Sequence, residues 1–225
     1  MKILVLQVVT PEIESYALYT ALINKAYCSL HGYDYEVYRD VDPTRHPSWS
    51  KVKAVRERLH LYDRVFVVDA DAYIQNFSIT VESFTGKPLK FCRNGDNGGK
   101  LLNAGLFMVD NLPGPEVMQL LQWWWEQHTG FERFWEQDAI NTLVEMPQFK
   151  EAIEVYPMRA FNSWWMDVTK NLNPDQYVQH IMARSIEKKV EIMEKEYDRL
   201  KGRYPILEYH LNHYAHATTT LPPVR

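Results

Sequence analysis

The feature that most constrains this chain is a short apolar run that ends in two aspartates, within residues 63–76. The run Val-Phe-Val-Val at residues 65–68 is β-branched and aromatic, which is typical of a strand buried on both faces of a sheet. Asp69 and Asp71 follow at once, and because buried carboxylates lose their hydration, we expect them at the open C-terminal end of that strand. There they can share a hard divalent cation that also binds phosphates of a ligand. The alternative is that they are solvated turn residues.

Strands and helices alternate ahead of this motif. We expect strands at residues 3–9 and 33–39, and helices at residues 12–31 and 51–61. Gly32 stands where the first helix needs a left-handed residue to end. The alternation favours an α/β fold with a mostly parallel central sheet and helices on both faces, with ligands beyond the C-terminal strand ends. Thr10, Arg39 and the two aspartates are expected to gather there.

The second half of the chain continues the pattern. We expect strands at residues 89–92, 101–109 and 155–157, and helices at residues 116–128 and 136–143. The glycine-rich residues 94–100 predict a hairpin turn or, alternatively, a flap over a ligand. Asn103, Ala104 and Gly105 are expected to interrupt their strand, where small residues let a sugar or phosphate approach the backbone.

The longest predicted helix spans residues 174–200, with apolar residues spaced by three and four. It is interpreted as a helix laid across the domain or as a surface for self-association. The histidines His210, His213 and His216 follow, and such a cluster is a credible source of a third metal ligand. We therefore expect one domain at residues 1–217 and a loose tail at residues 218–225.

Tryptophans are concentrated at two places. Those at residues 123–125 point around more than half a helical turn, so at least one indole must be exposed or pack on another element. Core packing is favoured there over sugar stacking. Trp164 and Trp165 are expected in a loop, where they line a carbohydrate site or lock the loop into the core.

Composition narrows the class of protein. The chain has 225 residues, 46% hydrophobic and 24% charged, which is enough to bury a substantial core. Its net charge of −4 does not indicate a basic surface that would bind nucleic acid. Cys28 and Cys92 are too few for a disulfide framework, so we expect reduced, buried thiols. The apolar start at residues 2–6 is too short for a signal or a membrane segment, so we expect a cytoplasmic protein.

These segments, in their order, resemble the nucleotide-sugar-dependent glycosyltransferases of the GT-A fold. Within that fold, the chain is similar to the family of fungal α-galactosyl and α-mannosyltransferases and plant xyloglucan xylosyltransferases. The matching segments are residues 27–33, 49–51, 67–76, 103–107, 136–139, 159–162 and 213–215. They resemble, among others, the family's hydrophobic-Asp-x-Asp core, its Asn-x-Gly-x-Phe strand, its Asp/Glu-Gln-x-Ala segment and its closing His-Phe-Ala.

The resemblance implies a metal-dependent transfer of a hexose or pentose from a nucleotide sugar to a carbohydrate or glycoprotein acceptor, with retention of anomeric configuration. It places Mn²⁺ or Mg²⁺ on Asp69, Asp71 and His213, against the diphosphate of the donor. The other donor-binding residues that the resemblance implies are Lys51, Asn103 and Gly105, and the strand ends add Thr10 and Arg39 as candidates. The implied catalytic residues are Gln137, near the anomeric carbon, with Asp138 and Lys51.

Several alternatives remain open at this point. A UDP-sugar is the expected donor, and GDP-mannose is the runner-up because the resembling family contains mannosyltransferases. A non-catalytic carbohydrate- or nucleotide-sugar-binding protein would use the tryptophan-rich surface instead. A phosphohydrolase with an Asp-x-Asp strand would want Thr or Val where this chain has Tyr73. His210 or His216 could replace His213 as the metal ligand.

Overall fold

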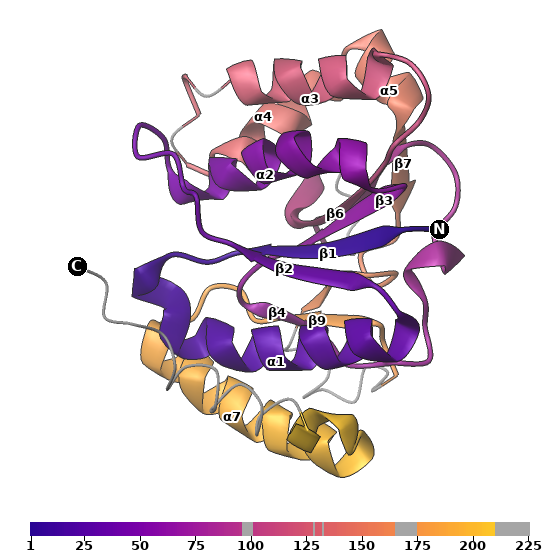
Figure 1. The fold of residues 1–225 in the computed structure, drawn as a ribbon. Helices are drawn as coiled ribbons and strands as arrows, with labels where there is room; N and C mark the ends of the chain where they lie inside the picture. Colours follow the sequence, from indigo (N-terminus) through magenta and orange to yellow (C-terminus); the bar gives the residue numbers. More distant parts are fainter. Residues whose placement is uncertain (96–100, 128, 132, 165–174, 210–225) are drawn as a thin grey trace, which may run out of the picture.

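The computed structural model describes residues 1–95, 101–127, 129–131, 133–164 and 175–209, and within them a sheet lies between two layers of helices (Figure 1). The sheet contains β1 Ile3–Val8, β2 Asp34–Tyr38, β3 Arg64–Val68, β5 Leu89–Arg93, β6 Leu102–Asp110 and β7 Ile153–Tyr156. Their order is β2-β1-β3-β6-β5-β7, and β6 alone runs antiparallel to its neighbours. The predicted α/β class with a mostly parallel sheet is confirmed.

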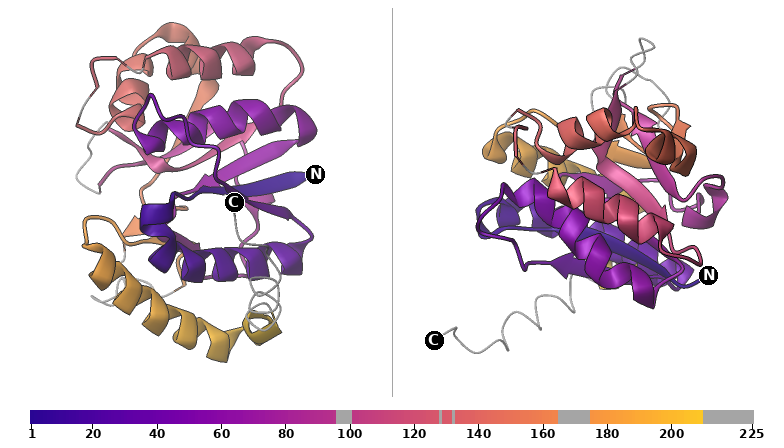
Figure 2. Two further views of the ribbon diagram at one scale, coloured as in Figure 1. Left: turned by 60° about the vertical axis from the view of Figure 1, so that its left-hand side comes forward. Right: turned by 90° about the horizontal axis from the view of Figure 1, so that it is seen from above.

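The helices cover both faces of this sheet. They are α1 Glu14–His31, α2 Ser50–Arg58, α3 Glu116–Glu126, α4 Glu136–Leu143, α5 Pro147–Ala152 and α7 Ile186–Arg203. Figures 1 and 2 show α1 and α7 on one side of the sheet and α2, α3 and α4 on the other. No described helix is both long enough and apolar enough to cross a membrane.

Strand β3 is buried on both faces, as its sequence predicts. Phe66 and Val68 pack into the hydrophobic cluster under α1 and α7, whereas Val65 and Val67 pack into the cluster under α2, α3 and α4. All four are fully buried. Because burial of one such side chain stabilises the fold by about 1.5–3 kcal/mol, the register of β3 is strongly fixed. The strand therefore delivers the residues that follow it to a defined position.

The prediction of one helix over residues 174–200 is wrong in its first part. Residues Val178–His180 form strand β9, which pairs between β4 Ala72–Ile74 and β8 Ser163–Trp164 in a second, three-stranded sheet. The spacing of Val178, Met182 and Ile186 mimics a helix, but pairing with β4 overrides that local pattern. The helix begins only at Ile186, where the Ser185 hydroxyl accepts a hydrogen bond from the backbone N–H of Lys188.

The prediction of a loop around Trp164 is wrong, because Ser163 and Trp164 form strand β8 of the same small sheet. The expected interruption of β6 falls in its pairing with β5. β6 is a single strand through Asn103 and Gly105, but Phe91 of β5 pairs with Phe107 and the next residue, Cys92, pairs with Asn103. The register therefore jumps over residues 104–106 of β6, at the small residues where the irregularity was predicted.

Helix α7 is laid across the domain, as one of the two interpretations predicts. Its apolar residues Met193, Tyr197 and Leu200 are buried, and the rings of Tyr197 and Tyr19 of α1 lie 6.0 Å apart. The Tyr73 hydroxyl, at the start of the small sheet, donates to Glu196 of α7 at 2.7 Å. The seam of α7 thus packs within the chain and joins α1 to the second sheet.

The tryptophan run and the cysteines behave as the sequence predicts. Trp124 is fully buried and its indole N–H donates to the carbonyl of Glu136 at 2.8 Å, whereas Trp123 is 39% exposed. Core packing is therefore the role of the central indole. Cys28 and Cys92 are free and buried, and burial raises the pKa of the Cys92 thiol to about 12.

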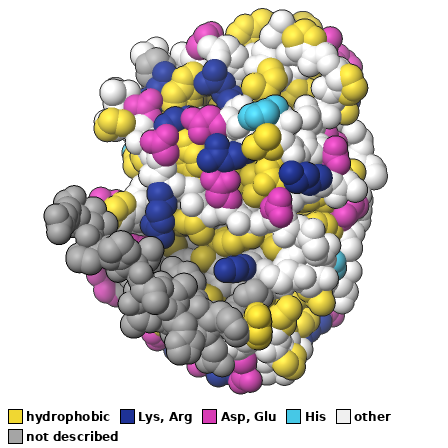
Figure 3. Space-filling model, in the orientation of Figure 1, with side chains coloured by type: hydrophobic (Ala, Val, Ile, Leu, Met, Phe, Trp, Pro, Cys, Tyr) yellow, Lys and Arg dark blue, Asp and Glu magenta, His cyan; other side chains and the backbone are white. Residues whose placement is uncertain are grey.

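Charged side chains on the outer face of the molecule are arranged in pairs of opposite sign. Figure 3 shows lysines, arginines and carboxylates interspersed over α2. Lys53 contacts Asp40 at 2.7 Å and Arg58 contacts Glu36 at 2.9 Å. Such exposed pairs contribute about 0–1 kcal/mol each, so this face adds little to the free energy of folding.

The end of α1 supports a test of the fold. Gly32 has a left-handed backbone (φ 71°) and its N–H closes the helix on the carbonyl of Cys28. We expect Gly32→Ala to lower the free energy of unfolding by about 1 kcal/mol, because alanine is strained there. Gly202→Ala is the matched control, since Gly202 lies in α7 with open space around it, and should be neutral or stabilising. Urea denaturation measures both; equal effects of the two substitutions would contradict the expectation.

Candidate functional site

Asp69 and Asp71 lie where β3 leaves the central sheet and β4 enters the small one. The turn between them is fixed by the backbone, because the N–H of Asp69 donates to the carbonyl of Gly105 at 2.9 Å. The Gln7 amide donates to the carbonyl of Asp69 at 3.1 Å from the neighbouring strand β1. The two carboxylates therefore stand at the C-terminal edge of parallel strands, as predicted.

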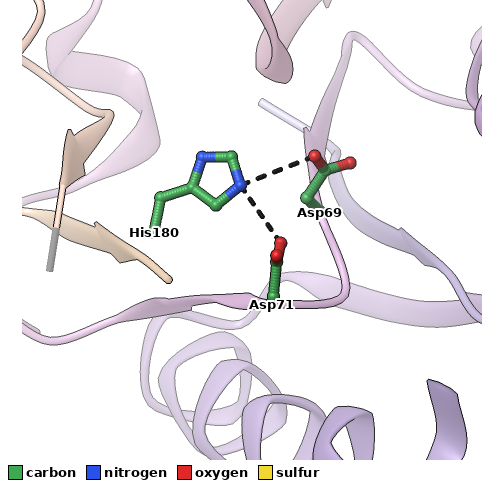
Figure 4. A group of neighbouring side chains, drawn as sticks. All are labelled: Asp69, Asp71 and His180. Carbon is green, nitrogen blue, oxygen red and sulfur yellow. Dashed lines mark hydrogen bonds and ion pairs between the residues drawn. The ribbon is translucent and has the colours of Figure 1, made fainter. Parts of the chain in front are cut away.

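His180 of β9 completes a group that could hold a metal ion. Its Nε2 atom lies 3.1 Å from Asp71 Oδ1 and 3.6 Å from Asp69 Oδ2 (Figure 4). The potential ligand atoms of the three residues all lie within 4.8 Å of one another. His180 reaches this point because β9 pairs with β4 in a register that sets His180 opposite Ala72, next to Asp71.

Each of the two carboxylates shares its oxygens between a lysine and the histidine. Asp69 Oδ1 contacts Lys51 Nζ of α2 at 2.8 Å, and Asp71 Oδ2 contacts Lys189 Nζ of α7 at 2.5 Å. The second oxygen of each carboxylate faces His180 Nε2. The lysines thus hold the carboxylates so that one oxygen of each points to a common position.

These contacts shift the acidity of the groups involved. Burial raises the pKa of Asp69, against the opposing effects of Lys51 and His180. Burial also acts to raise the pKa of Asp71, but His180 and Lys189 outweigh it and hold that pKa well below its usual range. Burial acts to lower the pKa of Lys51, yet Asp69 and Glu136 together raise it above its ordinary value. At neutral pH, Asp71 is therefore a carboxylate and Lys51 is an ammonium group.

The orientation of the His180 ring fits metal binding. Its Nδ1 atom lies 3.0 Å from the amide oxygen of Asn162, which can only accept a hydrogen bond. In the neutral ring the proton is then on Nδ1, and the lone pair of Nε2 faces the two carboxylates. A position between three such acceptors favours a cation, and a set of two carboxylates and one imidazole suits Mn²⁺ better than Mg²⁺.

Gly105 leaves room for this group. A Cβ atom at that position would lie 2.5 Å from His180 Cε1 and 2.6 Å from Asp69 Oδ2. Either contact is too short for real atoms, so any larger residue would push the ligand atoms apart. The glycine is therefore required by close approach of the side chains around it.

The group lies in a cleft of about 470 Å³, here called the aspartate cleft. Of the residues predicted from the sequence, the structure places Thr10, Lys51, Asp69, Asp71, Asn103, Gly105 and Gln137 in its lining. Lys51 is 5% exposed and its Nζ also contacts Glu136 at 2.7 Å and the carbonyl of Ala104 at 3.0 Å. The Gln137 side-chain oxygen accepts from the N–H of Ala104 at 3.1 Å.

Two predicted site residues lie elsewhere, and a third falls outside the described part of the chain. Arg39 pairs with Glu14 at 2.6 Å and lines a different cavity, between α1 and β2. Asp138 accepts a hydrogen bond from the N–H of Phe134 at 3.1 Å at the start of α4, which is the capping role acidic residues favour there. His213, like His210 and His216, lies outside the described residues.

Sequence reasoning missed His180, Lys189 and Glu136 as members of the site. His180 was read as part of a helix, although the run Tyr177-Val178-Gln179-His180-Ile181 has the aromatic and β-branched residues of a strand. Lys189 and Glu136 are ordinary helix residues in the sequence. Only the long-range packing of α7 and α4 brings them to the aspartates.

Comparisons with known proteins identify the fold. No family model matches the chain, and no curated protein sequence matches it. Among solved structures, it is similar to a glycosyltransferase involved in glycosylation of the major capsid of PBCV-1, with a TM-score of 0.70 and 20% identity. That match covers 87% of this chain and 100% of the other.

Two further neighbours belong to the same fold. The glycosyltransferase GlyE of Streptococcus pneumoniae TIGR4 has a TM-score of 0.61 and 13% identity, over 100% of this chain and 66% of its own. The galactosyltransferase LgtC, in complex with donor and acceptor sugar analogs, has a TM-score of 0.50 and 12% identity, over 85% of this chain and 95% of its own. The chain thus has the GT-A fold, and the resemblance to the fungal and plant family stays a prediction.

Asn162 offers a test of the proposed ligand geometry. Because it holds Nδ1 of His180, we expect Asn162→Ala to weaken Mn²⁺ binding by about 10- to 100-fold. Asn162→Asp keeps an acceptor at Nδ1 and should retain most of the affinity. Titration calorimetry with Mn²⁺ measures both variants. Equal affinities for Asn162→Ala and the parent chain would contradict the role of Asn162 in orienting His180 toward the ion.

Proposed function

We propose that this chain is a metal-dependent glycosyltransferase that moves a hexose or pentose from a UDP-sugar to a carbohydrate or glycoprotein acceptor. The single observation that carries the proposal is the group of Asp69, Asp71 and His180, flanked by two lysines, in a cleft of a GT-A fold. Neighbours of that fold are glycosyltransferases, and one of them was solved with donor and acceptor sugar analogs.

The charges of the cleft support a diphosphate as its ligand. Among the described residues, its lining contains the carboxylates of Asp69, Asp71 and Glu136 and the ammonium groups of Lys51 and Lys189, so these groups leave one negative charge in excess. A divalent cation makes the site net positive and, when bound, acts as a Lewis acid that neutralises charge on the diphosphate. Such a site binds an anionic donor only in its metal-loaded form.

The two lysines stabilise the leaving group in this proposal. Lys51 and Lys189 approach the aspartates from α2 and α7, on the two sides of the cleft. As the bond between the anomeric carbon and the diphosphate breaks, negative charge grows on the phosphate oxygens, and fixed ammonium groups favour that change. Glu136 keeps Lys51 charged and in place, because its Oε1 lies 2.7 Å from Nζ.

The transfer itself needs no strong protein nucleophile. An acceptor hydroxyl forms the new bond to the anomeric carbon, the bond to the diphosphate breaks, and a diphosphate oxygen takes the hydroxyl proton. Gln137 lies in the cleft and is too weak a nucleophile for a covalent intermediate, so same-face attack through an oxocarbenium-like state is proposed. One structure of the neighbour LgtC is of an active-site mutant in which a glutamine becomes a glutamate, so a glutamine belongs to the active site of that protein. An inverted product anomer, seen by NMR, would contradict this route.

Calorimetric titration with UDP and GDP tests the proposed function. With Mn²⁺ present we expect UDP to bind, and we expect chelation of the metal to weaken that binding at least 100-fold, since the unoccupied cleft repels phosphate. Asp71→Asn should have the same effect as the chelator. Asp198→Asn, an exposed carboxylate on α7, is the control and should bind UDP normally.

The outcomes separate the alternatives. Binding of GDP rather than UDP would support the GDP-mannose donor instead. Metal-dependent binding of UDP without transfer from UDP-sugars to any acceptor would favour a non-catalytic binding protein. If neither nucleotide binds, the proposal is contradicted, and the aspartates are part of a structural ion-pair network.

A further inference from the structure

A second cavity, here called the outer cavity, adjoins the aspartate cleft. It has a volume of about 510 Å³, and it is lined in part by the same residues as the aspartate cleft. The shared residues are Asn103, Phe134, Gln137, His180, Met182 and Ala183. The two cavities therefore form one continuous depression, with the metal-binding group on one side and the outer cavity on the other.

Two large aromatic rings lie open in the outer cavity. Trp164 is 37% exposed and Phe134 is 46% exposed. Trp164 is the register partner of His180 in the pair of β8 and β9, so both side chains point to the same face of the small sheet. Exposed aromatic rings are costly in water and flat enough to cover the C–H face of a sugar ring. This indole is therefore placed for stacking next to the proposed donor.

The described lining of the outer cavity carries positive charge. None of the described residues that line it is acidic, and Arg184 is the cationic residue among them. Arg133 adds a second guanidinium, which lies 4.9 Å from the centre of the Phe134 ring. Neither arginine forms an ion pair with a described residue. Within the described part of the chain no carboxylate neutralises them, and a guanidinium pairs well with an anionic group of a ligand.

We propose that the outer cavity binds the acceptor as a pyranose ring that stacks on Trp164 and carries a carboxylate or phosphate paired with Arg184. This inference rests on the proposed function, because it places the acceptor hydroxyl beside the donor sugar. Asn103 and Gln137 supply amide groups at the boundary of the two cavities, and Asn94 supplies one within the outer cavity, for the hydroxyls of the sugars. The substrate class is therefore an anionic saccharide.

Ligand-observed NMR titration of the full chain, saturated with UDP and Mn²⁺, tests this inference. The probes are methyl β-D-glucoside, methyl β-D-glucuronide and glucose 6-phosphate, which differ in charge at one carbon. We expect at least one of the two anionic sugars to bind about tenfold more tightly than the neutral glycoside. Which anion is preferred distinguishes a carboxylated acceptor from a phosphorylated one.

Substitutions assign the effect to residues. Arg184→Gln should remove the preference for the anion and leave the affinity for the neutral glycoside unchanged. Trp164→Ala should weaken all bound probes about tenfold, and Trp164→Phe should restore part of that loss. Trp123→Ala is the matched control, because Trp123 is equally exposed but lies on α3, outside both cavities. UDP affinity should be unchanged in all four variants.

The results that overturn the inference are distinct from failure of the proposed function. Normal UDP binding with no preference for either anion, or with a preference that survives Arg184→Gln, contradicts the acceptor assignment alone. An unchanged affinity in Trp164→Ala contradicts the stacking. If UDP does not bind to the parent chain, the proposed function fails and the acceptor assignment fails with it.

Discussion

The electrostatic repulsion between Asp69 and Asp71 is the constraint on which the site depends. The two carboxylates stand side by side at the end of a buried strand, where water screens them poorly. Lys51 and Lys189 each neutralise one oxygen, and the remaining oxygens converge on His180 Nε2. With Nδ1 of that ring held by Asn162, the converging atoms are all acceptors. We infer that the arrangement is complete only with a cation bound between them.

The fold brings residues from distant segments to one edge of the sheet, where they surround the two carboxylates. The aspartates follow β3, Thr10 follows β1, and the cleft lies beyond the C-terminal ends of these adjacent parallel strands. Helices α2 and α7, on opposite faces of the sheet, bring the lysines, and β9 brings the histidine. The hydrophobic clusters on the two faces hold these elements in place, so a rigid scaffold carries the charged groups.

Local sequence patterns predict the parts of this structure that depend on interactions between residues close together in the sequence. Hydrophobic spacing and backbone sterics act over a few residues, so they can be predicted from the sequence. This applies to the buried strand before Asp69, the left-handed Gly32 and the alternation of strands and helices. The position of His180 in the site cannot be predicted from the sequence in the same way. Its strand exists only because it pairs with β4, more than one hundred residues earlier, whereas its own apolar spacing resembles a helix. The aspartate pair was predictable, but the placement of His180 and Lys189 beside it required the tertiary structure.

The most direct test of this account is the pulsed electron paramagnetic resonance spectrum of Mn²⁺ bound to the chain with UDP. Coupling to a ¹⁴N nucleus shows that a histidine binds the ion. The account predicts this coupling in the parent chain and in His213→Ala, and its loss in His180→Ala. Coupling that persists in His180→Ala, or that disappears in His213→Ala, would contradict the assignment of Asp69, Asp71 and His180 as the metal site.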